Sequence, residues 1–232
     1  MHILLTRPLE DCSDLIIKFK ELGHSVSHFP LIKIEKMDYG EINFNDFSVI
    51  IFTSSNSIKN LKLENINKTL KCFCVGSTTE KLARASGFQN VIAADGNVRA
   101  LKELILQNHD KKDGKILYVS GELISFNLEE DLRKEGYEII RIINYSVEHN
   151  DEIKDDLIEE LKKNIPDIVY VYSENSSKSF LNIIKKYQLI DSWMNTNLMC
   201  IGEKTSSVLN EVKWKKIFLF SPGEEEFLLY KV

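Results

Sequence analysis

Short apolar runs alternate along this chain with longer stretches in which apolar residues recur at helical spacing. Such runs, bounded by polar residues, are typical of buried strands. We expect strands at residues 3–5, 49–52, 72–75, 116–119, 168–172, 198–201 and 217–220. Between them lie amphipathic patterns: Leu15, Ile16, Phe19 and Leu22 share one helical face, and Gly23 is placed to end that helix. Strands that alternate with helices predict an α/β fold with mostly parallel sheets.

The two halves of the chain repeat each other. Residues 2–35 align without gaps with residues 115–148, an offset of 113 residues (115 − 2). Further along, the VGSTT run that contains Gly76 matches the IGEKT run that contains Gly202. An internally duplicated β-α unit of this kind predicts two small domains rather than one large domain.

Two extended stretches, residues 25–36 and 138–148, break the alternation of strands and helices. Each is followed by a loop instead of a helix, and the two hold equivalent positions in the repeat. We therefore expect them to be two linker strands that run between the domains.

Composition narrows the class of protein. Of the 232 residues, 43% are hydrophobic, which suits a globular protein, and no apolar run approaches the roughly 20 residues of a membrane helix. The net charge of −5 argues against nucleic-acid binding, since nucleic-acid-binding proteins usually carry a basic stripe. The chain begins with a strand-like segment and lacks the regions of a signal peptide, so we expect a cytoplasmic protein that binds neither membrane nor nucleic acid.

The cysteines and histidines give no sign of a metal site. Cys12, Cys72, Cys74 and Cys200 form no CxxC pair, and the histidines form no HExxH or similar spacing. We place Cys72 and Cys74 on opposite faces of their strand. We interpret all four cysteines as buried, reduced thiols.

Hydroxyl-bearing residues, asparagine and glycine recur where predicted strands end. One pair of such sites is 53–56 and 172–176, and a second pair is 76–79 and 202–206. The carboxyl ends of parallel strands form the edge at which open α/β sheets bind ligands. Serine and asparagine there either cap the following helix or, with its free N–H groups, bind an anion. Neither GxGxxG nor GxxxxGK[ST] is present, so a nucleotide phosphate site is weakly supported.

Two further positions carry candidate chemistry. Arg7 follows the first predicted strand, where it either clamps a carboxylate through two hydrogen bonds or forms a surface ion pair. The repeat partner of this segment, Ser120–Gly121, lacks an arginine. Tyr145 lies in the second linker-like stretch, and packing is the common role of a tyrosine in a strand.

In their order and spacing, these motifs resemble those of the uroporphyrinogen-III synthase family. The resemblance covers essentially the whole chain and rests on TRP near the N-terminus, IIFTSSN, CVGSTTEKL, NYSV, YSENS and CIGEKT. It implies two flavodoxin-like α/β domains with parallel sheets, joined by a two-stranded linker. Residues 1–35 and 150–232 would form one domain, and residues 36–149 the other.

The resemblance also implies an activity. The family consists of lyases that cyclise hydroxymethylbilane to uroporphyrinogen III in haem biosynthesis, inverting ring D through a spiro intermediate, without a metal or organic cofactor. Tyr145 matches the family's tyrosine that is proposed to help expel the substrate hydroxyl as an acid. The substrate carries many carboxylates, which helix N-termini and hydroxyls can bind without a strongly basic protein. The substrate-binding residues that we expect are Arg7, Thr53, Ser54, Ser55, Gly76, Thr78, Thr79, Ser120, Gly121, Ser173, Asn175, Ser176, Gly202, Lys204 and Thr205.

Other interpretations share parts of this pattern. The main alternative is a non-catalytic, two-lobed α/β sensor that closes on a small anion; Tyr145 and the paired glycine-threonine segments favour the synthase. A nucleotide-sugar or phosphate transferase is disfavoured, because the phosphate loop and a catalytic acid pair are missing. The expected partners are the linear tetrapyrrole and, transiently, hydroxymethylbilane synthase. We expect a monomer, since no exposed apolar stripe stands out.

Overall fold

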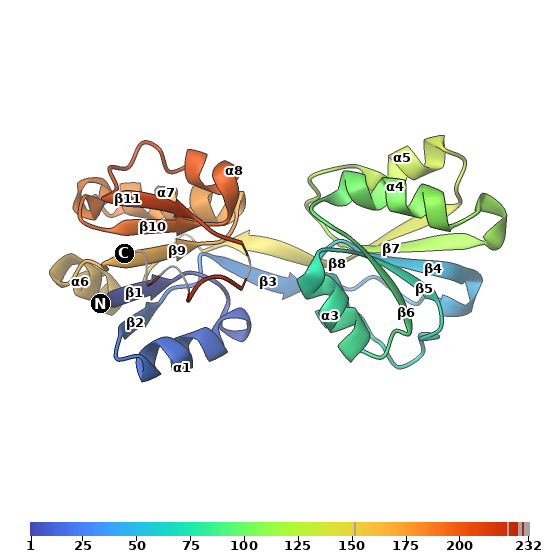
Figure 1. The fold of residues 1–232 in the computed structure, drawn as a ribbon, viewed down its shortest axis with the longest axis horizontal. Coiled ribbons are helices and arrows are strands. Elements are labelled where there is room, and N and C mark those ends of the chain that lie inside the picture. The colour runs from blue at the N-terminus through green and yellow to red at the C-terminus, as the bar shows by residue number, and fades with distance from the viewer. Residues whose placement is uncertain (151, 222, 227–228, 230–232) are drawn as a thin grey trace. The chain divides into compact units, whose positions relative to one another are not determined.

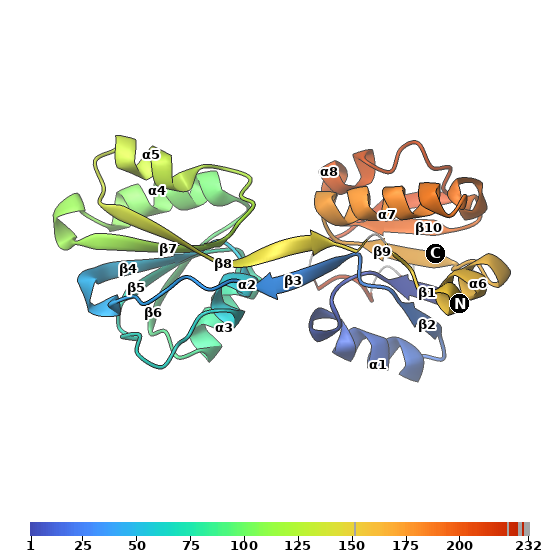
Figure 2. The same cartoon turned by 180° about the vertical axis from the view of Figure 1, so that it is seen from behind.

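The computed structural model describes residues 1–150, 152–221, 223–226 and 229. The chain forms two compact units, the first made of residues 1–33 and 148–232 and the second of residues 34–147. Within each unit, helices cover both faces of one sheet (Figures 1 and 2). The predicted fold class, α/β with two mostly parallel sheets, is confirmed.

The first unit is built on a parallel sheet with the strand order β11-β10-β9-β1-β2. Its strands are β1 (His2–Leu5), β2 (Ser25–His28), β9 (Ile168–Val171), β10 (Asn197–Cys200) and β11 (Lys216–Leu219). Its helices are α1 (Ser13–Glu21), α6 (Asp155–Lys163), α7 (Glu174–Lys186) and α8 (Gly202–Ser207), with 3₁₀ turns at Leu9–Asp11 and Ile190–Trp193. Because both faces are covered, β1, β9 and β10 are buried along their whole length.

Two apolar clusters fill the space on either side of this sheet. Leu4 packs in the cluster that contains Trp193, whereas Ile3 and Leu5 pack in the cluster that contains Tyr170. Side chains alternate between the faces of a strand, so a continuous apolar run supplies both clusters. This explains why the strands of the sequence are short runs without polar alternation.

The second unit contains a sheet with the order β3-β8-β7-β4-β5-β6, and the pairs from β8 to β6 are parallel. Its strands are β3 (Ile32–Lys36), β4 (Phe47–Phe52), β5 (Lys71–Val75), β6 (Asn90–Ala94), β7 (Lys115–Gly121) and β8 (Ile139–His149). Its helices are α2 (Ser55–Lys59), α3 (Ser77–Ala85), α4 (Val98–Asn108) and α5 (Leu128–Lys134), with 3₁₀ turns at Phe44–Asp46 and Lys111–Asp113.

The extended stretch 25–36 is two strands, which corrects the prediction of a single linker strand. Its first part is β2, at the edge of the first sheet beside β1, and only its last part is β3. Pro30 lies between them and lacks the N–H that a continuous strand ladder needs. The second stretch is β8, which neighbours both β3 and β7. The chain leaves the first unit within β3 and returns within β8.

The prediction that Cys72 and Cys74 lie on opposite faces of β5 is wrong. Their sulfur atoms are 3.7 Å apart, because residues two positions apart in a strand share a face. Both thiols, like those of Cys12 and Cys200, are free and buried. Burial raises the pKa of Cys12 to about 11 and that of Cys200 to about 12, so these side chains are neutral thiols at physiological pH.

Candidate functional site

In the second unit, the hydroxyl of Tyr118, which lies within β7, reaches the carboxyl end of the neighbouring strand β4. Thr53 follows β4, and its Oγ1 lies 3.3 Å from the phenolic oxygen of Tyr118 on β7. These strands are parallel neighbours, so their ends meet at one edge of the sheet. Tyr118 is buried, and burial raises the pKa of its phenol above the ordinary value of 10.0. The Tyr118 side chain is therefore a neutral donor or acceptor beside Thr53.

Tyr145 packs on Gly121 at the same edge. The two residues are partners across β7 and β8, just after a shift in register between Ser120 and Gly121. A Cβ atom at Gly121 would lie 2.6 Å from Cζ of Tyr145 and 2.9 Å from its hydroxyl oxygen. Glycine is therefore required here for space, since only a residue without a side chain lets the tyrosine ring lie against the strand end. Tyr145 itself is 8% exposed.

Arg141, on β8, ties down the end of β7. Its Nε donates to Oγ of Ser120 at 2.7 Å, and its Nη2 donates to the carbonyl oxygens of Gly121 at 2.7 Å and Glu122 at 3.0 Å. The Glu122 N–H in turn donates to the carbonyl of Tyr145 at 2.9 Å. One guanidinium thus fixes the backbone against which the Tyr145 ring packs.

Sequence analysis missed Arg141 and Tyr118, although each carries a signal. Arg141 is a charged residue inside the apolar run EIIRII, and Tyr118 lies inside ILYV. Asn144 was also missed: it is fully buried on β8, and its Nδ2 donates to the carbonyl of Ser57 in α2 at 2.7 Å. A polar residue inside a buried strand needs a partner, and that requirement is the signal by which all three could have been found.

The serines at two strand ends cap helices. Ser54 precedes α2, and its Oγ accepts the N–H of Asn56 at 3.2 Å. Ser173 precedes α7, and its Oγ accepts the N–H of Ser176 at 3.0 Å. The capping interpretation of these residues is thus observed directly. Anion binding by Ser54, Ser173 and the half-buried Ser55 stays a prediction.

In the first unit, the end of β9 carries an acid within the expected binding segment. Glu174 is exposed and accepts a hydrogen bond from Nζ of Lys178 at 2.6 Å, one helical turn further along α7. That hydrogen bond and the charge of Lys178 hold the pKa of Glu174 below its usual 4.5. Asn175 is half-buried, and Ser176 is buried with its Oγ 2.8 Å from that of Ser173.

The two paired glycines share a backbone conformation. Gly76 has φ 77° and Gly202 has φ 74°, in the region that side chains disfavour. A Cβ atom at either position would meet nothing within 4 Å, so the requirement for glycine comes from the backbone and not from crowding. The space over both residues is open, unlike that over Gly121.

The threonines that follow these glycines are turned inward. Thr79 and Thr205 are buried, whereas Thr78 and Lys204 are exposed. Oγ1 of Thr205 donates to the carbonyl of Ile201 at 2.8 Å. Its own carbonyl accepts the hydroxyl of Ser177 at 2.8 Å, which joins α8 to α7, the helices that follow β10 and β9. In the first unit these contacts bring the two predicted segments, 173–176 and 202–205, to one edge.

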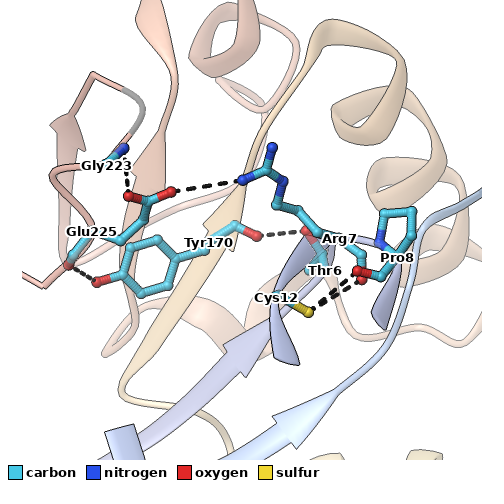
Figure 3. A network of polar contacts seen from close by, with 7 residues as sticks. All are labelled: Thr6, Arg7, Pro8, Cys12, Tyr170, Gly223 and Glu225. Carbon is cyan, nitrogen blue, oxygen red and sulfur yellow. Dashed lines mark hydrogen bonds and ion pairs between the residues drawn. The ribbon is translucent and has the colours of Figure 1, made fainter. Parts of the chain in front are cut away.

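Arg7 is part of an ion pair and is not an isolated cation. Its Nη1 lies 3.8 Å from Oε1 of Glu225 (Figure 3). Its guanidinium carbon lies 4.5 Å from the centre of the Tyr172 ring. The preceding Thr6 donates its hydroxyl to the carbonyl of Tyr170, which fixes the end of β1 beside β9. Glu225 was not predicted, since it lies beyond the last strand and outside every motif.

The described residues show neither a metal site nor a membrane-spanning helix. They contain no cluster of three His, Cys, Asp or Glu side chains arranged as metal ligands would be. They also contain no helix long and apolar enough to cross a membrane. The carboxyl edges carry hydroxyls, phenols, backbone N–H groups and the arginines Arg7 and Arg141. Groups of these types can bind carboxylates or transfer protons.

The sequence and the fold were compared with known proteins. The model of the uroporphyrinogen-III synthase HemD family matches residues 13–221. The chain belongs to this family. Its members are cyclising lyases of haem biosynthesis, so the resemblance drawn from the motifs is confirmed. No curated protein matches the chain in sequence.

Solved structures agree on the fold. The uroporphyrinogen-III synthetase of Helicobacter pylori superimposes with a TM-score of 0.67 at 16% identity, over 100% of both chains. A mutant uroporphyrinogen III synthase from the extremely thermophilic bacterium Thermus thermophilus gives 0.60 at 15% identity, over 100% of this chain and 98% of that one. At such identities the likeness concerns the fold, and residue roles have to be argued from this chain's own contacts.

Proposed function

We propose that this chain is a uroporphyrinogen-III synthase that closes hydroxymethylbilane to uroporphyrinogen III with inversion of ring D. Beyond family membership, the proposal rests on the close packing of the Tyr145 ring against Gly121. A phenol held at the carboxyl edge, with no room for a Cβ beneath it, is a group kept in one orientation. Such fixed geometry suits a reaction in which positioning carries most of the rate.

Tyr145 would act as the acid of the first step. Its phenol donates a proton to the terminal hydroxyl, the C–O bond breaks, and water leaves while electrons from the pyrrole nitrogen form an azafulvene. The substituted carbon of ring D then attacks to give the spiro intermediate, and fragmentation and reclosure give the inverted ring. The phenolate regains a proton from the pyrrole system as aromaticity returns. A general acid is typically worth about 10²- to 10⁴-fold in rate.

The carboxylates of the substrate would contact the strand ends that the motifs mark. No atom lies within 4 Å of where a Cβ would stand at Gly76 or Gly202, which leaves room for a carboxylate where α3 and α8 begin. The longer helix α7, with thirteen residues, adds a dipole that favours negative charge near Ser173. Local groups of this kind bind anions despite the net charge of −5.

The test is a coupled assay. Porphobilinogen and hydroxymethylbilane synthase supply fresh hydroxymethylbilane to the purified protein, and the oxidised products are separated as isomers. We expect type III to dominate, with Tyr145→Phe closer to the uncatalysed mixture. Type I alone, formed at the uncatalysed rate, would contradict the synthase. Stoichiometric retention of the tetrapyrrole without turnover would favour the two-lobed sensor instead.

A further inference from the structure

Strand β8 carries one extra residue where it pairs with the end of β7. The two strands run parallel and pair in step up to Ser120 and Ile143. The next residue of β7, Gly121, pairs with Tyr145 and skips Asn144. Asn144 is therefore the extra residue of a β-bulge, directly before Tyr145. Bulges are rare between parallel strands, are common beside active sites, and re-aim the side chains next to them.

The bulge is held on two sides. Asn144 is fully buried, and its Nδ2 donates to the carbonyl of Ser57 in α2 at 2.7 Å, across 87 positions of the sequence (Figure 2). Its own carbonyl accepts the N–H of Met37, just after β3, at 2.9 Å. The side chain of Asn144 thus fixes the bulge to a helix, and its main chain fixes the bulge to the segment that follows the neighbouring strand.

The contact with α2 joins two parts of the candidate site. Helix α2 begins directly after Thr53 and Ser54, and the N–H of Ser57 donates to the carbonyl of Ser54 at 3.1 Å. The same residue that accepts from Asn144 is therefore bonded to the strand end that the motifs mark. Through Asn144, the backbone next to Tyr145 is tied to the carboxyl end of β4.

Asparagine is an unfavourable residue at this position unless it has a task. Its Oδ1 is buried and has no hydrogen-bond partner among the described residues, and the same is true of the Ser57 hydroxyl. A buried acceptor without a partner lowers stability, and an apolar side chain at residue 144 would avoid that cost. Departures from such packing rules are expected at functional sites. This one occurs next to Tyr145.

We propose that Asn144 is a positioning residue for Tyr145: it anchors the β-bulge to α2 and so sets the direction in which the phenol donates its proton. The inference rests on the proposed function, in which Tyr145 is the acid. Asn144 acts on the backbone of β8, whereas Arg141 fixes the end of β7. Because Asn144 acts through Tyr145, its loss lowers the rate by no more than loss of the phenol does.

The test is Asn144→Leu, which keeps a branched side chain and removes the amide. We expect kcat to fall about tenfold with KM little changed, since a small displacement of a reacting group lowers the rate strongly. In the Tyr145→Phe background, the same change should lower kcat further by less than about twofold. An equal fall in both backgrounds would show a general structural defect and would overturn the proposal.

Asn197→Leu is the matched control. Asn197 is also buried in a strand, its Oδ1 also lacks a partner among the described residues, and its Nδ2 donates to the carbonyl of Asp167 at 3.5 Å. It begins β10, so it lies at the edge of its sheet opposite the marked strand ends. Asn197→Leu should therefore leave kcat unchanged. A fall in kcat as large as that of Asn144→Leu would overturn the proposal.

A second measurement needs no turnover. The protein is labelled with fluorotyrosine, and the fluorine resonance of Tyr145 is the one that is absent from Tyr145→Phe. We expect this resonance to shift or broaden in Asn144→Leu and to stay in place in Asn197→Leu. If Asn144→Leu does not fold, Asn144→Ala, which removes the amide without adding bulk, replaces it in both experiments.

The two measurements separate this inference from the proposed function. If the wild type forms type III product, an unmoved Tyr145 resonance or an unchanged kcat in the Asn144 variant would overturn the positioning role alone. If the wild type forms no type III product while the Tyr145 resonance moves, the proposed function fails, and Asn144 still determines the placement of Tyr145.

Discussion

The carboxyl edges of the two sheets share a backbone and differ in chemistry. Both carry a serine that caps a helix, Ser54 and Ser173, and a glycine with positive φ, Gly76 and Gly202. The second unit adds buried phenols and Arg141, which donates three hydrogen bonds to the end of β7. The first unit adds Arg7, whose charge faces a carboxylate of the protein. The two edges thus share a backbone arrangement, and their different side chains give each edge its own chemistry.

From this contrast we infer that the two edges have different roles, proton donation in the second unit and substrate binding in the first. In the second unit, Arg141 fixes the end of β7 against which the Tyr145 ring packs, which suits a positioned proton donor. In the first unit, Arg7 lies between Glu225 and the Tyr172 ring, and we predict that this edge binds substrate carboxylates. Changes at the second edge should therefore lower kcat, and changes at the first should alter affinity.

Gly121→Ala should have the largest effect. The new Cβ would lie 2.6 Å from the Tyr145 ring, so the ring must move away from its position against residue 121. We expect loss of activity of about 10²-fold or more, as for loss of a general acid, and destabilisation by about 1–3 kcal/mol from overpacking. Steady-state kinetics and urea unfolding measure the two effects.

Gly202→Ala is the matched control in the first unit, because a Cβ there meets nothing within 4 Å. It should cost about 1–2 kcal/mol of stability from its positive φ and leave kcat nearly unchanged. A fall in kcat equal to that of Gly121→Ala would contradict the division of roles between the edges.

Tyr145→Phe should come next. It removes the hydroxyl but keeps the ring on Gly121, so we expect kcat to fall about 10²-fold or less while KM changes little. The product isomers and rates are measured in the coupled assay. Tyr118→Phe, which removes the hydroxyl that contacts Thr53, is the companion variant. A loss far above 10⁴-fold for Tyr145→Phe would mean that the phenol does more than assist departure of the hydroxyl.

Arg141→Met should act through Tyr145. It removes three hydrogen bonds at the end of β7, so we expect kcat to fall by about tenfold and stability by about 1–3 kcal/mol. Arg133→Met is the control: Arg133 donates to the carbonyl of Ile139 at 3.1 Å, where β8 begins, and should affect stability alone. Unchanged kcat in Arg141→Met would show that Tyr145 keeps its place without this support.

The fold could be predicted because its signals are local or repeated. Apolar runs predicted strands, the repeat at an offset of 113 residues predicted the duplication, and the alternation of strands and helices predicted parallel sheets. The break at Pro30 and the shared face of Cys72 and Cys74 also follow from local rules, which were misapplied. Contacts between distant segments could not be predicted from the sequence. No local pattern indicates that Arg141 contacts Ser120 or that Glu225 contacts Arg7. Those contacts are what give each edge its chemistry.

Loss of a helix cap should have a modest and equal effect in the two units. Ser54→Ala and Ser173→Ala each remove one acceptor for a helix N–H, which costs about 0.5–2 kcal/mol of stability, and glycine at either position should cost a few tenths. Urea unfolding measures these costs. A KM that rises in the alanine variant and is not restored by glycine would mean that the hydroxyl also binds substrate, and it would show on which edge.

The pH dependence of stability should show the smallest effect, with one histidine in each unit. Burial lowers the pKa of His109 in the second unit and of His24 in the first below the usual 6.5. A lowered pKa means that the folded state disfavours the charged ring, so this contribution to stability is complete above pH 6.5 and declines as the pH falls below it. Unfolding midpoints between pH 7.5 and 5 should therefore decline less in His109→Gln, whose site is 4% exposed, than in the wild type. His24→Gln, at the more exposed site, should flatten the decline less than His109→Gln. The reverse order would mean that the groups that raise the pKa of His109, the Gly114 backbone first and then the charges of Asp113 and Asp110, offset most of the effect of its burial.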